Sequence, residues 1–272
     1  MQPAAGPARR RRPKPRMSEP SIERSELVAY LDRLLDSPSF SDYGPNGLQV
    51  EGRRQVRRVV TGVSACVELF ERAAEAGADA VLVHHGTLWK GLPQEVTGVR
   101  YQRIKTLIRN DLNLIAYHLP LDAHADLGNN ALAARALGCE QLEPFAEFEG
   151  RKIGFCGPLA EPIDPDELLD RCTDVFGAQP SAFLSGGDAI ETIGIVSGGG
   201  SRALYEAIDL GLDAFVTGEP TEWVMNVAKE AGIHFVAAGH YHTEVLGIRA
   251  LGEHLADHFG IAVEFVDIPN PV

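Results

Sequence analysis

Two adjacent histidines, His84 and His85, follow the aliphatic run at residues 80–83 and precede a glycine. An imidazole is the commonest neutral metal ligand in proteins, and its ordinary pKa also lets it carry protons near neutral pH. A histidine beside aliphatic residues is nevertheless more often a packed, hydrogen-bonded core residue. The pair therefore indicates a functional site only if other ligands converge on it.

Two other segments combine a histidine with a carboxylate where a strand-like run ends. One run ends in His118, which is followed by Asp122, and another leads into His240, which is followed at the same spacing by Glu244. Open α/β sheets bind their ligands outside the carboxyl ends of the strands. Because imidazoles and carboxylates together suit zinc, iron, manganese or nickel, these segments and the histidine pair predict a metal site.

The spacing of these residues favours two divalent ions rather than one. Neighbouring residues of a strand point to opposite faces, so His84 and His85 are expected to bind one ion each. His240 and Glu244 would share one face if a helix opens at this point, and Glu244 could then bridge both ions.

The segment from His118 to Asp122 contains Pro120, which interrupts a regular helix. Only one of the two flanking side chains therefore needs to reach the metal. We expect Asp122 to be the ligand and His118 to lie beside it, while His242 points elsewhere.

Short β-rich runs alternate with amphipathic runs along the chain, which is typical of an α/β protein with largely parallel sheets covered by helices. The expected strands are residues 56–64, 78–85, 113–118, 192–197, 213–218, 234–239 and 261–267. The expected helices are residues 18–35, 65–77, 100–111, 128–138, 164–177, 201–211, 221–232 and 249–260.

An internal repeat relates residues 59–86 to residues 192–220, with one extra residue in the glycine-rich turn of the second copy. Strand–helix–strand units share such patterns for physical reasons alone, but two related lobes would also explain the repeat. We therefore expect lobes at residues 17–125 and 126–272, which could interlink, with the metal site between them at the carboxyl ends of the strands.

Composition indicates a soluble, globular protein without a membrane span. The chain has 272 residues, 44% of them hydrophobic, and a net charge of −13. So acidic a chain does not attract nucleic acid broadly. The four cysteines show no paired spacing, which favours reduced thiols and a cytoplasmic location.

Residues 1–16 form a basic, proline-rich tail without the apolar stretch of a secretory signal. We expect a disordered tail, which an upstream choice of start codon would also explain because Met17 follows it. A nucleic-acid-binding arm is the alternative.

Several long motifs resemble those of one known family. They are GPNGLQVEG, HHGTLWKG, YHLPLDAHADLGNNALAARALG and GHYHTEVLGIRAL, with the helix RYQRIKTLIRND between them. Together they resemble the GTP cyclohydrolase 1 type 2 homologues, a Nif-three-like family with a dinuclear metal centre and a hexameric assembly. The resemblance runs from about Glu26 to Val266.

The resemblance implies a ligand set and an activity. The implied metal ligands are His84, His85, Asp122, His240 and Glu244. Glu244 would contact both ions, and His118 would be the candidate proton carrier. The family name implies hydrolytic opening of the imidazole ring of guanine in GTP, a small nucleotide substrate. A non-catalytic protein that handles metal, or a phosphoesterase, would use the same residues, and the metal itself stays open.

Three further features have an alternative structural explanation. The turn at residues 197–201 could cradle an anion or could be a tight turn between strand and helix. Trp89 and Leu92 could form a subunit contact of the hexamer or could cap the local core. The positive charge near the histidine pair could bind a substrate, or it could belong to the solvated face of a helix. The residues that carry it are Lys90, Arg100, Arg103, Lys105 and Arg109.

Overall fold

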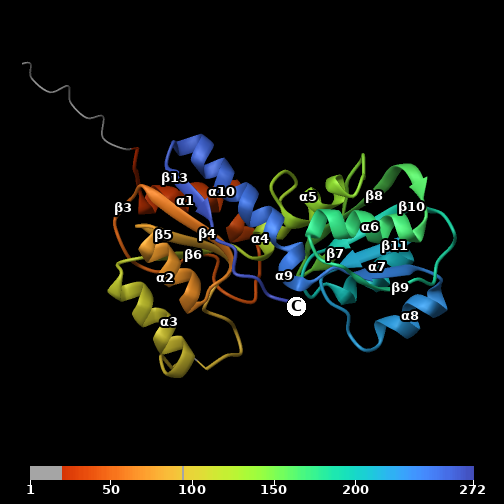
Figure 1. The fold of residues 1–272 in the computed structure, drawn as a ribbon, viewed down its shortest axis with the longest axis horizontal. Helices are drawn as coiled ribbons and strands as arrows, with labels where there is room; N and C mark the ends of the chain where they lie inside the picture. Colours follow the sequence, from red (N-terminus) through yellow and green to blue (C-terminus); the bar gives the residue numbers. More distant parts are fainter. Residues whose placement is uncertain (1–19, 94) are drawn as a thin grey trace, which may run out of the picture.

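Two α/β lobes lie side by side, and each has a central sheet with helices on both faces (Figure 1). The structure is a computed structural model, and it describes residues 20–93 and 95–272. The basic tail at residues 1–16 lies outside this range. The expected α/β class, with two sheets covered by helices, is confirmed.

The first sheet has the strand order β13-β4-β5-β6-β2. Its strands are β13 (Ala262–Phe265), β4 (Arg58–Ser64), β5 (Ala80–His85), β6 (Asn113–Ala116) and β2 (Gly47–Val50). All neighbours are parallel except β2, which runs antiparallel to β6 at the edge. Parallel strands end at one edge of the sheet, so β5 and β6 deliver the residues that follow them to the same place.

Helices cover both faces of the first sheet. They are α1 (Arg24–Leu34), α2 (Val67–Glu75), α3 (Gly98–Arg109) and α10 (Val245–Phe259). Alternation along β5 divides its side chains between two cores: Leu82 packs with α1 and α10, whereas Val81 and Val83 pack with α2 and α3. A strand buried on both faces reads as a continuous apolar run, which explains the pattern before His84.

The second sheet has the strand order β7-β8-β10-β11-β12-β9. Its strands are β7 (Glu143–Phe148), β8 (Arg151–Ile163), β10 (Ile190–Val196), β11 (Ala214–Thr217), β12 (His234–Ala237) and β9 (Ser181–Phe183). Only β10, β11 and β12 are mutually parallel, so this sheet is mixed. The expectation of largely parallel sheets holds for the first lobe only, because β7 and β8 form a hairpin at one edge.

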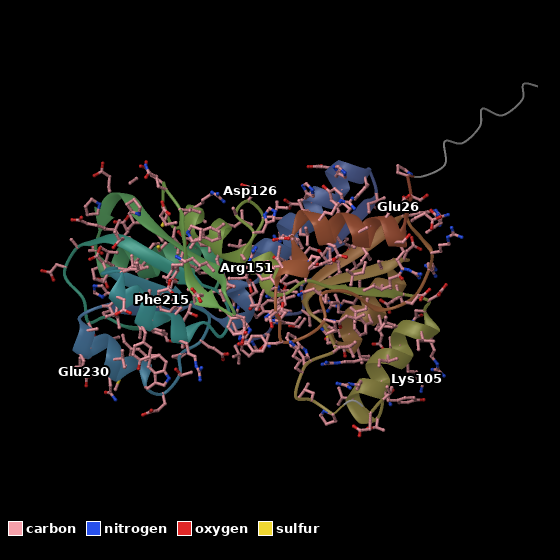
Figure 2. The ribbon with its side chains drawn as sticks, turned by 180° about the vertical axis from the view of Figure 1, so that it is seen from behind. Glu26, Lys105, Asp126, Arg151, Phe215 and Glu230 are labelled. Carbon is pink, nitrogen blue, oxygen red and sulfur yellow. The ribbon has the colours of Figure 1, made fainter. Side chains whose placement is uncertain are left out.

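Helices also cover both faces of the second sheet. They are α5 (Asn129–Ala136), α6 (Pro165–Phe176), α7 (Leu204–Asp209) and α8 (Val224–Ala231). The first two pack on one face and the last two on the other. Figure 2 shows Phe215 within this lobe, where it is fully buried, and Lys105 at the outer side of the other lobe on α3.

The internal repeat corresponds to equivalent units, β4-α2-β5 and β10-α7-β11. Asp79 accepts hydrogen bonds from the backbone N–H groups of Arg57 and Arg58 (2.8 and 3.2 Å). Asp213 accepts the same pair of bonds from Glu191 and Thr192 in the second lobe (3.0 and 2.9 Å). The two lobes thus share local hydrogen bonds as well as a sequence pattern.

The chain does not divide into lobes at a single point near residue 125, because C-terminal elements belong to the first lobe. Helix α10 and strand β13 lie in the C-terminal part but complete the first lobe (Figure 1). The reason is that β13 pairs with β4, while α10 packs on the first sheet through Ile248 and Leu251. Local periodicity identifies a strand but not its partner.

Several short elements precede or lie between the longer helices and strands. They are β1 (Ile22–Glu23), β3 (Gln55–Val56), η1 (Ser37–Ser39), α4 (Leu119–Asp122), η2 (Ser201–Ala203) and α9 (His240–Thr243). The first helix begins at Arg24 rather than near residue 18, because β1 pairs with β3. Within the described ranges, no helix has the length and hydropathy needed to cross a membrane.

Candidate metal centre

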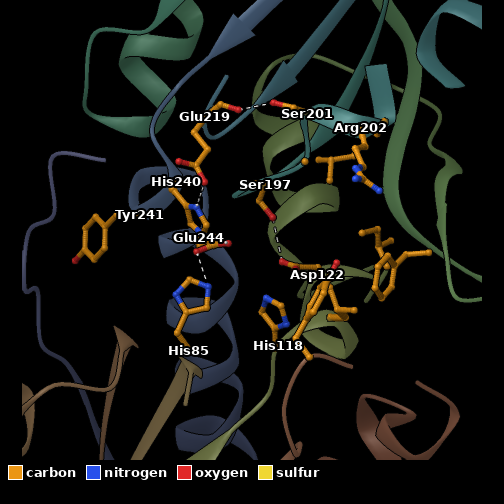
Figure 3. A pocket seen from close by; sticks show the side chains of 18 of the residues that line it. His85, His118, Asp122, Ser197, Ser201, Arg202, Glu219, His240, Tyr241 and Glu244 are labelled. Carbon is orange, nitrogen blue, oxygen red and sulfur yellow. Dashed lines mark hydrogen bonds and ion pairs between the residues drawn. The ribbon is translucent and has the colours of Figure 1, made fainter. Parts of the chain in front are cut away.

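Histidines and carboxylates from both lobes converge at the junction, where the parallel strands end (Figure 3). His84 and His85 end β5, and Asp122 ends α4, the short helix that follows β6. From the second lobe, His240 opens α9 directly after β12, and Glu244 follows that helix. The predicted convergence of three segments is therefore present.

Glu244 lies between three imidazoles and is 2% exposed. Its Oε1 atom is 3.5 Å from Nε2 of His84 and 3.3 Å from Nε2 of His240. Its Oε2 atom is 3.2 Å from Nε2 of His85. The carboxylate thus faces ring nitrogens on two sides, as a bridging ligand would.

Each of the four histidines in the cluster has its Nδ1 atom bound to a fixed partner. The partners are the Tyr117 carbonyl for His84 (3.1 Å), the Ser64 hydroxyl for His85 (3.0 Å), Asp42 for His118 (2.7 Å) and Glu219 for His240 (3.0 Å). A bond at one ring nitrogen sets the orientation and the free tautomer of the other. All four rings therefore present Nε2 to the cluster.

Asp122 is buried and held by two neutral donors. Asn129 and the Ser197 hydroxyl both donate to its Oδ1 atom, at 2.9 and 3.0 Å. Its other oxygen, Oδ2, lies 3.6 Å from Nε2 of His84. Ser197 and Ser64 occupy equivalent positions of the internal repeat, and each supports one predicted ligand from the end of its strand.

Two groups of side chains have ligand atoms close enough to hold a metal ion. One contains His84, His85 and His118, and the other contains His85, His240 and Glu244, with all ligand atoms of each within 4.8 Å of one another. The strand alternation expected to separate His84 from His85 is incomplete at the strand end, since their ring centroids are 4.7 Å apart. His118, expected beside the ligands, belongs to the first group.

Two atoms of the cluster are buried without a hydrogen-bond partner among the described residues. They are Nε2 of His84 and Oε2 of Glu244. A buried polar atom without a partner carries a large desolvation cost. Since both are metal-ligating atoms that face the cluster, the residues present fit a bound cation.

The charges of the cluster shift several pKa values. Burial lowers the pKa of His84, but the charges of Asp122 and Glu244 outweigh it and raise the pKa to about 9. Burial also lowers the pKa of His240, but Glu244 and Glu219 outweigh it and raise the pKa to about 9. Burial raises the pKa of Glu244, yet the neighbouring imidazoles hold it well below its usual range. The raised pKa values of the two histidines show that the carboxylates favour positive charge at this place, which a metal ion could supply once the ring protons leave.

The glycine-rich turn after β10 approaches the ligands closely. Gly198 has a φ of +61°, and a Cβ atom here would overlap Oε1 of Glu244 and lie 3.0 Å from Nε2 of His240. Its N–H donates to the Thr243 hydroxyl at 3.0 Å. The first glycine of this turn is therefore required for space at the site, which neither the anion-cradle nor the tight-turn interpretation included.

A cavity of about 1050 Å³ opens beside the cluster and is lined by both lobes. Of the basic residues predicted near the histidine pair, Arg103 lines it. Trp89, expected at a subunit contact or over the local core, lines it too, with its ring centroid 5.8 Å from that of His85. Leu92 is 52% exposed.

Sequence reasoning missed two carboxylates that orient the histidines. Glu219 is the second residue after the end of β11, so the rule that placed His84 at a strand end would also have found it. Asp42 lies in a loop 76 positions before its partner His118, and no local pattern indicates that contact.

The chain matches a family model and has close relatives. The model described as Duf34/NIF3 (NGG1p interacting factor 3) matches residues 22–271. A protein of Pseudomonas aeruginosa named GTP cyclohydrolase 1 type 2 homolog is 46% identical over 251 residues, covering 92% of this chain and 99% of that protein. One of Escherichia coli with the same name is 42% identical over 254 residues, 92% and 100% of the two chains.

Solved structures agree with this relationship. Protein ybgI, described as of unknown function, has a TM-score of 0.87 and 42% identity, covering 92% of this chain and all of that chain (100%). TTHA1606 of Thermus thermophilus has a TM-score of 0.85 and 39% identity, with the same coverage of both chains. The fold of this chain is therefore that of these relatives, and the chain is a member of the Duf34/NIF3 family.

Proposed function

We propose that the protein is a metal-dependent hydrolase that binds two divalent transition-metal ions and opens the imidazole ring of guanine in GTP. The observation that carries the proposal is the pair of ligand groups that share His85 and face one cavity. The name of the relatives supports the choice of reaction.

The residues proposed to hold the ions are His84, His85, Asp122, His240 and Glu244. Bound divalent ions would supply Lewis acidity, which polarises the group attacked and lowers the pKa of water. The Glu244 carboxylate is placed between the rings, and the bonds at each Nδ1 atom keep the Nε2 atoms pointing inward. The protein thus orients the ligand atoms before any cation binds, which lowers the cost of ordering them.

His118 is the proposed proton carrier. Its Nδ1 atom donates to Asp42, which is 6% exposed and also accepts from the N–H groups of Tyr43 and Leu119. Burial raises the pKa of Asp42, but the hydrogen bond and charge of His118 outweigh it and lower the pKa below its usual value. The anionic carboxylate keeps the His118 ring fixed, with Nε2 free to exchange a proton in the cavity.

In the proposed reaction, a water oxygen bonds to C8 of guanine and the C8–N9 bond breaks. One proton of the water ends on N7 and the other on N9, which becomes an amine, while C8 stays on N7 as a formyl group. GTP and one water therefore give a single ring-opened product. His118 would carry one of these protons.

We also propose a homohexamer that acts on small molecules in the cytoplasm. The resemblance to the family supports the assembly, and exposed apolar side chains beside the cavity loop, Leu92 and Val96, suit a subunit contact. The acidic charge and a cavity of this size favour a small ligand over a nucleic acid. Free cysteines, three of them buried, suit a reducing compartment.

The test combines metal analysis with product identification. Protein purified with excess Mn²⁺, Zn²⁺, Fe²⁺ or Ni²⁺ should contain about two ions per chain by elemental analysis. Incubated with GTP, it should yield a triphosphate heavier by one water, identified by mass spectrometry. Cyclic nucleotides and phosphoesters run in parallel test for a phosphoesterase. One ion or none, or recovery of intact GTP with every metal, would contradict the proposal.

A further inference from the structure

Aromatic rings line one wall of the cavity in a continuous row from the second lobe to the metal centre. The ring centroids are 5.0 Å apart between Phe148 and Tyr43, 6.0 Å between Tyr43 and His118, and 5.2 Å between His118 and Trp89. All four residues line the cavity. The rings are inclined to one another by 38°, 61° and 86°, so each offers its own polarisable face or edge to a planar ring of a ligand.

Hydrogen bonds anchor the backbone at Tyr43, which is 49% exposed, and the indole of Trp89. The Tyr43 carbonyl accepts a bond from the N–H of Lys90 at 2.7 Å. The Trp89 indole N–H donates to the Gly86 carbonyl at 3.0 Å. Phe148 comes from β7 of the other lobe. The Tyr43 ring packs against Phe148 and is half-exposed, so part of its surface is available for stacking.

A cation lines the same cavity. Arg202, on η2 directly after the glycine-rich turn, lines the cavity and makes no ion pair within residues 20–93 and 95–272. In Figure 3 its side chain extends from beside Ser201 toward the side of the pocket where Asp122 lies. Burial and Asp42 raise the pKa of Tyr43 while Arg202 opposes them, so this charge acts on the ring row.

The nearest glutamate on the same helical segment has another partner. Glu206, four positions after Arg202, accepts a hydrogen bond from the N–H of Glu147 at 2.9 Å. A guanidinium is always charged, and its planar fork suits the oxygens of a phosphate. Among the described residues Arg202 has no ion-pair partner, and its guanidinium is suited to bind a phosphate in the cavity that the rings line.

We propose that the cavity binds a phosphorylated heteroaromatic compound, with its ring on the wall of Phe148, Tyr43 and Trp89 and its phosphate on Arg202. This inference deepens the proposed function, on which it rests for the orientation of the ring toward the metal centre. It assigns specificity for the phosphate to Arg202, a residue that contacts none of the ligands.

The tryptophans provide a direct probe. The chain has two, Trp89 in the wall and Trp223 in the second lobe, so a Trp223→Phe background leaves Trp89 as the single reporter. Metal-loaded and metal-free protein would be titrated with guanosine, GMP, adenosine, AMP and inorganic phosphate, and quenching of Trp89 fluorescence recorded.

Two variants separate the two contacts. Arg202→Gln should weaken binding of GMP or AMP about 10- to 100-fold and leave the matching nucleoside unchanged, because one charge-assisted contact is lost. Tyr43→Leu should weaken nucleotide and nucleoside alike, by about tenfold. Arg109→Gln and Tyr101→Leu make the same exchanges at positions that do not line the cavity, and they should bind as the parent does.

The outcomes distinguish this inference from the proposed function. If no nucleotide quenches Trp89, or if Arg202→Gln weakens nucleoside and nucleotide equally, the inference is wrong. If the nucleotide binds in an Arg202-dependent way but GTP is never opened, the proposed reaction is wrong and the inference stands. If GTP is opened with the same KM by Arg202→Gln, the reaction stands and the phosphate site is wrong.

Discussion

Oε1 of Glu219 lies 3.0 Å from Nδ1 of His240, and the opposite nitrogen of the same ring faces Glu244 (Figure 3). The bond fixes which ring nitrogen carries the proton and so which one can bind a metal. Such partners are set up by tertiary structure and commonly change metal affinity by about 10- to 100-fold.

Replacing Glu219 should weaken the more exposed of the two ligand groups. Glu219→Ala removes the bond to His240, so we expect about a 10- to 100-fold loss of affinity for one ion, with the other retained. Titration with Zn²⁺ against a competing chelator measures both sites. Glu222→Ala, an exposed glutamate three positions away, is the matched control. Unchanged binding of both ions by Glu219→Ala would remove this role.

Glu244 and Asp122 should differ in how many ions they hold. Glu244→Gln should disturb both ions, because its two oxygens face imidazoles of both groups. Asp122→Asn should mainly loosen one, because its free oxygen faces only His84. Elemental analysis after dialysis gives the ions per chain. Equal losses in the two variants would contradict the bridging assignment.

A methyl group at Gly198 should disturb the metal ligands in addition to straining the backbone, which has a positive φ here. Gly198→Ala places a Cβ against Oε1 of Glu244, so loss of metal should accompany a loss of stability. Gly211→Ala is the control, with a φ of +70° and nothing within 4 Å of the added carbon. It should cost about 1–2 kcal/mol of unfolding free energy and keep its metal. Full metal content in Gly198→Ala would argue against the close approach.

His118→Gln separates proton transfer from metal binding. If His118 carries a proton, the variant should keep about two ions per chain and lose GTP turnover by about 100-fold or more. If it loses one ion, His118 is a ligand, as its place in the first group allows. Asp42→Asn, which keeps the side-chain shape, should lower turnover less. Metal content and single-turnover rates are the two measurements.

The stability of the metal-free protein should fall as the pH rises. The pKa values of His84 and His240 are raised to about 9 from an ordinary 6.5. Groups with raised pKa values stabilise the fold fully below the ordinary value, and their contribution is lost as the pH passes through the raised one. Melting temperatures of chelator-treated protein should therefore decrease from about pH 6.5 to about pH 9.

Metal should reverse this trend, because bound cations displace the same ring protons and bind more tightly as protons become scarce. The gain in melting temperature on adding Zn²⁺ should grow over the same range. Glu244→Gln removes a carboxylate that both rings face, so it should flatten the decrease in the metal-free protein. A melting temperature that rises with pH without metal would contradict the assigned protonation.

The sequence by itself determined the class of fold and the place of the site. Apolar runs and helical periodicity are local properties, so the strands that deliver His84, His118 and His240 could be predicted from it. The rule that ligands collect at the carboxyl ends of parallel strands then placed Asp122 and Glu244 beside them. The repeat predicted two lobes for the same reason, since equivalent patterns form equivalent units.

Only the tertiary structure decided which distant segments meet. Strand β13 returns to the first sheet, Asp42 reaches His118 across 76 positions, and Trp89 turns into the cavity. None of these contacts can be predicted from local sequence. A loop or an edge strand with a given residue pattern can pack against many different partners. The choice of partner comes from packing of the whole chain, in which burial and hydrogen bonding are satisfied together.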